Sequence, residues 1–75
     1  MNKGVIIMSK YLEFSILERK LKTKVIGVYS KRNGDKLAII KWYGAWRQYA
    51  FFPESGTLYN TECLNDIISY IKGVR

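Results

Sequence analysis

Basic and aromatic side chains gather in the middle of this chain in a pattern that suits nucleic-acid binding. The segment 41–53, KWYGAWRQYAFFP, holds both tryptophans, and its only charged residues are Lys41 and Arg47. Lysine and arginine neutralise phosphates and release counterions, whereas tryptophan and tyrosine offer flat faces on which bases stack. Glutamine can reach a base edge or a phosphate. We predict one binding face on a β-sheet, carrying Arg19, Lys22, Lys24, Lys41, Tyr43, Trp46 and Gln48.

The same residues have structural interpretations. Tyr43 and Trp46 could form a stabilising cross-strand aromatic pair, while the lysines protect an exposed sheet from association. Trp42 and Arg47 are expected to lie opposite each other and to form a cation–π contact, with the alternative that Arg47 binds phosphate or an acidic side chain of a partner. The pattern therefore narrows the function to recognition without identifying the partner.

Catalysis and metal binding have little support in the composition. The chain has no histidine and a single cysteine, Cys63, so the usual zinc ligand sets cannot form. Its six carboxylates are scattered without a paired-acid signature. We expect no catalytic residue, no metal, no cofactor and no enzymatic activity. Cys63 is expected to be a small buried residue at the start of a helix.

Charge and length set the class of the protein and its partners. The 75 residues carry a net charge of +7, with nine basic residues and one acid between Arg19 and Arg47. Such asymmetry favours a negatively charged partner, most simply DNA or RNA. One cysteine and no long apolar run predict a soluble cytoplasmic protein with no membrane partner.

Alternating and β-branched residues predict four strands followed by one helix. The strands are expected at residues 11–19, 22–31, 36–43 and 46–52. The pairs Asn33-Gly34 and Gly44-Ala45 favour two-residue hairpin turns, of types I′ and II′. The fold class is therefore α+β: a four-stranded antiparallel meander, curled or barrel-like, with a C-terminal amphipathic helix on one face. The chain forms one domain, residues 1–75, with a lead-in at 1–9 in which Met8 is an alternative start, a sheet at 10–53 and a helix at 60–73.

The helix is expected to be capped by Asn60 or Thr61 and to end at Gly73. Its apolar stripe is predicted to be Leu64, Ile67, Ile68 and Ile71.

Turn geometry fixes the pairing register and therefore the two faces of the sheet. With two-residue turns, and Arg19 paired with Lys22, the face under the helix is predicted to hold Leu12, Phe14, Ile16, Val25, Gly27, Tyr29, Ala38, Ile40, Trp42, Tyr49 and Phe51. The opposite face would be basic and aromatic near Tyr43 and Trp46. Its other half would be aliphatic, and could join two copies of the chain through Leu37, Ile39 and Phe52.

The C-terminal half of the sequence resembles small bacteriophage and prophage proteins. The resemblance covers about the last thirty-five residues and rests on the motifs Lys-Trp-Tyr-x-x-Trp-Arg-Gln-Tyr-x-Phe-Phe-Pro and Cys-Leu-x-Asp-Ile, which begin at Lys41 and Cys63. It implies a phage context, and thus the host cytoplasm, without implying a mechanism. Two functions fit that context. The first is low-specificity nucleic-acid binding, and the alternative is inhibition of a host protein, such as a defence nuclease, through the same aromatic patch.

Overall fold

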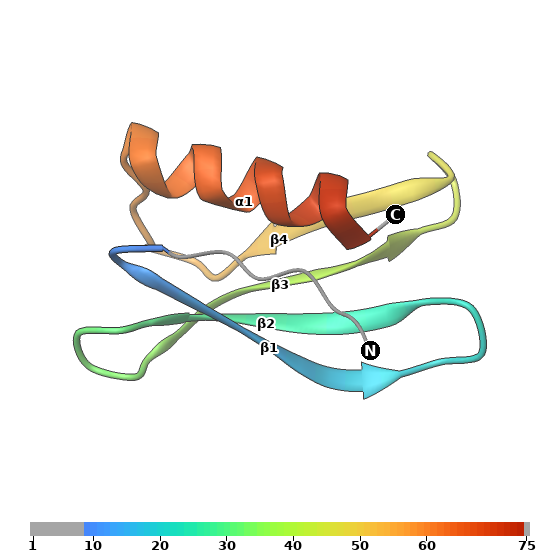
Figure 1. Ribbon diagram of the computed structural model, residues 1–75, viewed down its shortest axis with the longest axis horizontal. Helices are drawn as coiled ribbons and strands as arrows, with labels where there is room; N and C mark the ends of the chain where they lie inside the picture. Colours follow the sequence, from blue (N-terminus) through green and yellow to red (C-terminus); the bar gives the residue numbers. More distant parts are fainter. Residues whose placement is uncertain (1–8, 75) are drawn as a thin grey trace.

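The computed structural model describes residues 9–74, which form one antiparallel sheet covered on one face by one helix (Figure 1). The strands β1 (Leu12–Arg19), β2 (Lys24–Ser30), β3 (Lys36–Tyr43) and β4 (Gln48–Pro53) pair in sequence order, and α1 (Thr61–Val74) follows. This confirms the α+β meander. The sheet is open, with β1 and β4 as its edges, so the barrel-like form is not adopted. Most of the predicted lead-in, with Met8, lies outside the described residues.

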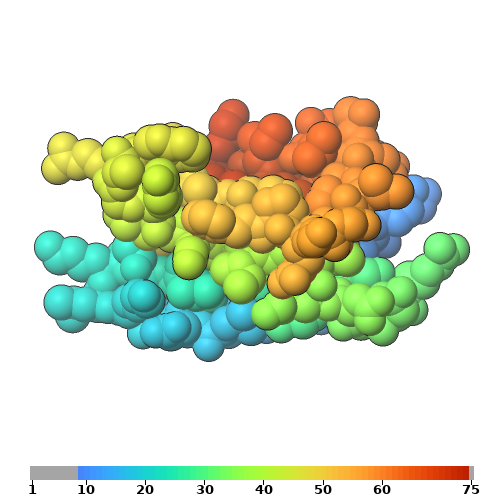
Figure 2. All heavy atoms as spheres, turned by 180° about the vertical axis from the view of Figure 1, so that it is seen from behind, coloured from blue at the N-terminus to red at the C-terminus, as the bar shows by residue number. Residues whose placement is uncertain are grey.

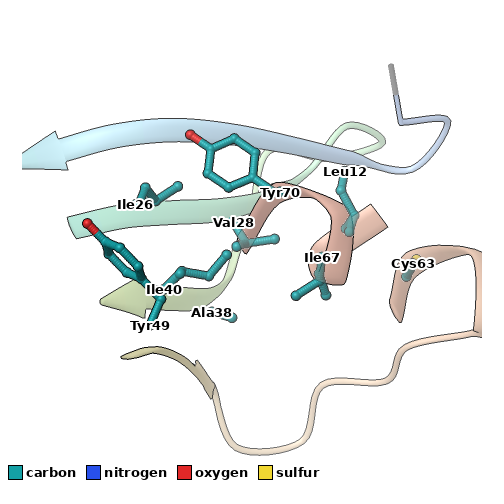
Figure 3. Packing of buried hydrophobic residues seen from close by; sticks show 9 residues of the cluster. All are labelled: Leu12, Ile26, Val28, Ala38, Ile40, Tyr49, Cys63, Ile67 and Tyr70. Atoms are coloured by element: carbon teal, nitrogen blue, oxygen red, sulfur yellow. The ribbon is translucent and has the colours of Figure 1, made fainter. Parts of the chain in front are cut away.

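The core lies between the sheet and α1 (Figure 3). Ile26, Val28 and Ile40 are completely buried in the middle of the sheet. The buried residues of the helix are Cys63, Ile67 and Tyr70, and the Tyr70 ring stacks on Phe14 of β1 with 4.4 Å between ring centroids. As predicted, the helix covers the face that bears Phe14, Ile40, Tyr49 and Phe51.

The predicted helical stripe is only partly correct. Ile67 is buried, but Leu64 and Ile68 are exposed, because Cys63 and Tyr70 occupy the face that packs on the sheet. The helix also continues past Gly73 to Val74. The helix begins at Thr61, in agreement with the predicted cap at Asn60 or Thr61.

Asn60 caps the helix, accepting a hydrogen bond at its side-chain oxygen from the Cys63 amide at 2.8 Å. The prediction of a small buried cysteine at the start of the helix is confirmed as well.

The predicted register of β2 is wrong by one residue. In the structure Phe14 pairs with Val28, and Ile26 pairs with Ile40, so Ile26 and Val28 face the helix. Val25, Gly27 and Tyr29, which were expected in the core, lie on the opposite face, here called the outer face. Gly27 does make room for a ring there, since a methyl group on it would approach the Tyr29 ring to 2.7 Å.

The turns explain this error. Arg19 pairs with Lys24, so the β1–β2 turn encloses four residues, and a bulge follows between Ile16 and Glu18. In the β2–β3 turn Gly34 has the expected positive φ of 80°, but Asn33 does not share it, as a type I′ turn would require. This turn is closed instead by a hydrogen bond from the Ser30 amide to the Asp35 carbonyl. The longer turns alone would shift the register by two residues and keep the faces. The bulge between Ile16 and Glu18, and a second between Val28 and Tyr29, make the shift one residue and exchange the two faces of β2.

The β3–β4 hairpin keeps its predicted faces although its turn is also longer. Tyr43 pairs with Gln48, and Trp42 with Tyr49, so residues 44–47 form a four-residue turn in place of the predicted type II′ turn. Moving the register by two residues leaves each side chain on the same face, because strand side chains alternate with a period of two. Trp46 consequently lies in the turn and not in β4.

Candidate nucleic-acid interface

The structure divides the predicted binding patch between the two faces of the sheet. Lys24 has the same orientation as Ile26 and Val28, and its partner Arg19 shares that side, which is the side of the helix. Lys41, Tyr43 and Gln48 have the opposite orientation and lie on the outer face, as predicted. The one-residue error in β2 accounts for the division, since it moved the basic residues of the first hairpin to the other face.

A groove, here called the tip groove, opens at the end of the molecule where α1 finishes. It lies between the β1–β2 and β3–β4 turns, which Figure 1 shows at the same end as the helix C-terminus. Its lining residues are Lys22, Thr23, Trp42, Arg47, Gln48, Tyr49 and Val74. Two of these are cationic, and none of them is acidic. The groove therefore combines positive charge with aromatic surface in one concave site.

Two rings form the aromatic part of the tip groove. Tyr49 is 8% exposed, and its hydroxyl accepts a hydrogen bond from the Lys24 amide at 3.1 Å, which ties β4 to β2 across the sheet. The Trp42 ring meets Tyr49 edge to face, with 5.5 Å between centroids and an interplanar angle of 84°, and remains 41% exposed. Tyr49 thus holds Trp42 in place while leaving part of it available for stacking.

Arg47 does not form the predicted cation–π contact with Trp42. Across residues 9–74, such contacts join Lys10 to Tyr11 and Lys41 to Phe52. Arg47 is the last residue of the β3–β4 turn, outside the strands, and its guanidinium remains a candidate for binding an anion at the groove.

The backbone of Arg47 is strained. Its φ is 56°, the left-handed region in which glycine is favoured, and a side chain there costs about 1–3 kcal/mol. The turn imposes this conformation, as the Arg47 and Trp46 amides donate hydrogen bonds to the carbonyls of Gly44 and Tyr43 at 3.2 Å each. A strained residue at the edge of a groove is a reason to look for a functional role in its side chain.

A second aromatic site, here called the outer cluster, lies on the other side of the same hairpin. It consists of Lys41, Tyr43, Trp46 and Phe52. The Trp46 and Tyr43 rings meet edge to face with 4.8 Å between centroids, and Trp46 is 65% exposed. The ammonium of Lys41 lies 5.1 Å from the centre of the Phe52 ring. The predicted aromatic pair is therefore present, although it joins a strand to a turn.

Positive charge dominates the end of the molecule that holds the tip groove. The two turns, the strand ends beside them and the end of the helix contribute one acid, Glu18, and the basic residues Arg19, Lys20, Lys22, Lys24, Arg47 and Lys72. Burial raises the pKa of the Tyr70 phenol, and the positive charge of Arg19 opposes that rise, which agrees with Arg19 lying on the helix side. Glu62 lies in the first turn of α1, at the opposite end of the helix.

Five residues of the tip groove were not among the predicted binding residues: Thr23, Trp42, Arg47, Tyr49 and Val74. Trp42 and Arg47 were expected to form a structural pair, with phosphate binding by Arg47 as the alternative. Only the loop lengths could have revealed their position, because a four-residue turn moves Arg47 out of the strand and frees the Trp42 ring. Ile39 and Phe52 do lie on the outer face, where they remain a predicted contact between two copies, whereas Leu37 packs against the core and lines a pocket with Leu12 and Cys63. Among residues 9–74, α1 is not long or apolar enough to cross a membrane.

Comparison with known proteins gives one informative relative. The chain is 38% identical over 64 residues to the "uncharacterized 9.3 kDa protein" of Acholeplasma phage L2, which covers 84% of this chain and 82% of the relative. The similarity thus extends well beyond the last thirty-five residues. No protein-family model and no solved structure matches the chain.

Proposed function

We propose that this chain, which belongs to a family of small phage proteins that includes the 9.3 kDa protein of Acholeplasma phage L2, is a non-enzymatic nucleic-acid-binding module. The tip groove is its principal binding site. The observation that carries the proposal is the juxtaposition of Lys22 and Arg47 with the half-exposed ring of Trp42. Cations that meet phosphates beside a ring that stacks on a base are the two components of sequence-independent recognition.

The strain at Arg47 supports the same proposal. A glycine would relieve the backbone of the turn, yet the residue there is an arginine that lines the groove. We take this as support for a binding role of the Arg47 side chain that offsets the cost of its backbone conformation. A phosphate is the natural partner for its planar guanidinium, which can donate two parallel hydrogen bonds to it.

Low sequence specificity follows from the elements that form the site. Its residues come from two turns, a strand end and the last turn of the helix, and α1 packs on the sheet through Cys63, Ile67 and Tyr70. The exposed residues of α1 mix Glu62, Leu64 and Ile68 with Asn65, Ser69 and Lys72, so the helix carries a single basic residue and no basic recognition surface. The helix α1 therefore supports the sheet and does not act as a recognition helix that enters the major groove.

A second function, binding of a host protein, is favoured by the outer cluster. Trp46, Tyr43 and Phe52 form an exposed, mostly apolar surface with a single cation beside it, and buried tryptophan and tyrosine anchors dominate protein interfaces. Inhibition of a host enzyme such as a defence nuclease is the form this function would take in a phage protein. The two functions differ in how they depend on salt.

Titration with an oligonucleotide at two salt concentrations tests the proposal. Phosphate contacts by Lys22, Lys24, Arg47 and Lys41 give a slope of log K against log salt of about −2 to −3, so an approximately fourfold rise in salt should weaken binding roughly 15- to 60-fold. Fluorescence anisotropy of a labelled oligonucleotide measures this directly. A protein that binds no nucleic acid at low salt, yet binds a host protein with little salt dependence, would refute the proposal and establish the second function.

A further inference from the structure

The two tryptophans lie on opposite faces of the β3–β4 hairpin. Trp42 shares the helix side with Tyr49, against which it packs. Trp46 packs against Tyr43 and lines a small hollow with Ala50 and Phe52, whose side chains point to the outer face. Only three residues, 43–45, separate the two tryptophans in the sequence, and Trp46 lies in the four-residue turn. In Figure 2 this turn, coloured yellow, projects from one end of the molecule.

Polar side chains connect these two aromatic sites. Arg47 and Gln48 line the tip groove and directly follow Trp46 in the chain. Lys41 lies beside Phe52 on the outer face. A polyanion that leaves the groove past Arg47 therefore meets the outer cluster next, where Lys41 lies beside Phe52.

From this arrangement we infer that the ligand is single-stranded nucleic acid, which crosses the tip of the hairpin and stacks bases on Trp42 on one side and on Trp46 on the other. The inference rests on the proposed function. A single strand is flexible enough to pass over the turn, and its bases have free faces for stacking. In a duplex each base is stacked between its neighbours, and removing it costs a few kcal/mol per base. A duplex could use the charges of this site but not both of its rings.

Intrinsic fluorescence can test both contacts separately, because Trp42 and Trp46 are the only tryptophans in the chain. The variants Trp42→Phe and Trp46→Phe each leave one reporter and keep an aromatic ring at the substituted position. Each variant is titrated at low salt with oligothymidylates of increasing length and with a blunt duplex of matched length. Equal melting temperatures of the variants and the parent protein ensure that the reporters describe the same fold.

We expect a sufficiently long oligothymidylate to quench the fluorescence of both tryptophans, and shorter oligonucleotides to quench Trp42 but not Trp46. The single strand should also bind at least about tenfold more tightly than the duplex, because its bases are free to stack on the two rings. Equal or tighter binding of the duplex would overturn this inference while leaving the proposed function standing. So would a Trp46 reporter that responds to no oligonucleotide length. Failure of both forms to bind would instead overturn the proposed function itself.

Discussion

Replacing Ile67 with alanine should destabilise the protein by about 2–5 kcal/mol, a large part of the roughly 4–11 kcal/mol expected for a domain of this size. Ile67 is 3% exposed and packs in the cluster that joins α1 to the sheet. Its truncation removes buried methyl groups and leaves a cavity that the rigid sheet cannot fill. Urea denaturation followed by circular dichroism measures the change.

Ile68→Ala is the matched control for this prediction. It makes the same chemical change one residue further along the same helix, where the side chain is 50% exposed. Alanine also has the higher helix propensity, which offsets part of the lost contact, so the loss should stay below about 1 kcal/mol. Equal costs at the two positions would show that α1 packs through a different face.

Combining Lys22→Glu with Arg47→Gly should abolish nucleic-acid binding without destabilising the fold. The first change reverses the charge of one cationic residue that lines the tip groove, and the second removes the other. Glycine also relieves the left-handed backbone at position 47, so the melting temperature should stay the same or rise. Binding is measured by anisotropy at low salt, and stability by thermal unfolding.

Lys31→Glu combined with Arg32→Gly controls for net charge. It makes the same two exchanges in the β2–β3 turn, which lies at the other end of the sheet (Figure 1). If long-range charge alone attracted the ligand, both double variants would lose affinity to a similar extent. We expect only a modest loss in the control, because local phosphate contacts at the tip groove provide most of the affinity.

Alternation of apolar residues was sufficient to predict the elements of this fold. It identified four strands and a helix, and it assigned the correct faces to β3, to β4 and to β1 as far as Ile16, since these strands carry a clear contrast between their two sides. In β2 the sequence KVIGVYS offers similar residues on both sides, so the register depended on the turns. Alternation alone could not decide between Val25 and Ile26 as the core residue.

Loop lengths and β-bulges were the features that the sequence did not reveal. Asn33-Gly34 and Gly44-Ala45 are typical of two-residue turns, but backbone hydrogen bonds close longer turns around both pairs. In the β3–β4 hairpin the error was two residues, so Tyr43 and Lys41 kept their face. In the first two hairpins, bulges at Ile16/Glu18 and Val28/Tyr29 made the error one residue, so β2 exchanged its faces and Lys24 moved to the helix side. The predicted patch was therefore right in composition and only partly right in arrangement.

The helix stripe failed for a different reason. Leu64 and Ile68 are more apolar than Cys63 and Tyr70, yet Cys63 and Tyr70 are buried. Tyr70 is buried because its ring stacks on Phe14, with an interplanar angle of 11°. The stabilisation from this stacking depends on where β1 places the Phe14 ring, which helical periodicity alone does not predict.

Mapping the contact surface by NMR is the most direct test of the tip groove as the binding site. An isotope-labelled sample is titrated with a single-stranded oligonucleotide at low salt, and the backbone amide and indole signals are followed. We predict that the largest shifts fall on the Trp42 and Trp46 indoles, the Arg47 amide and the amides of residues 22–24, whereas Leu64 and Ile68 on the exposed side of α1 remain unchanged. Shifts concentrated on α1, or a spectrum unchanged at oligonucleotide excess, would contradict the account.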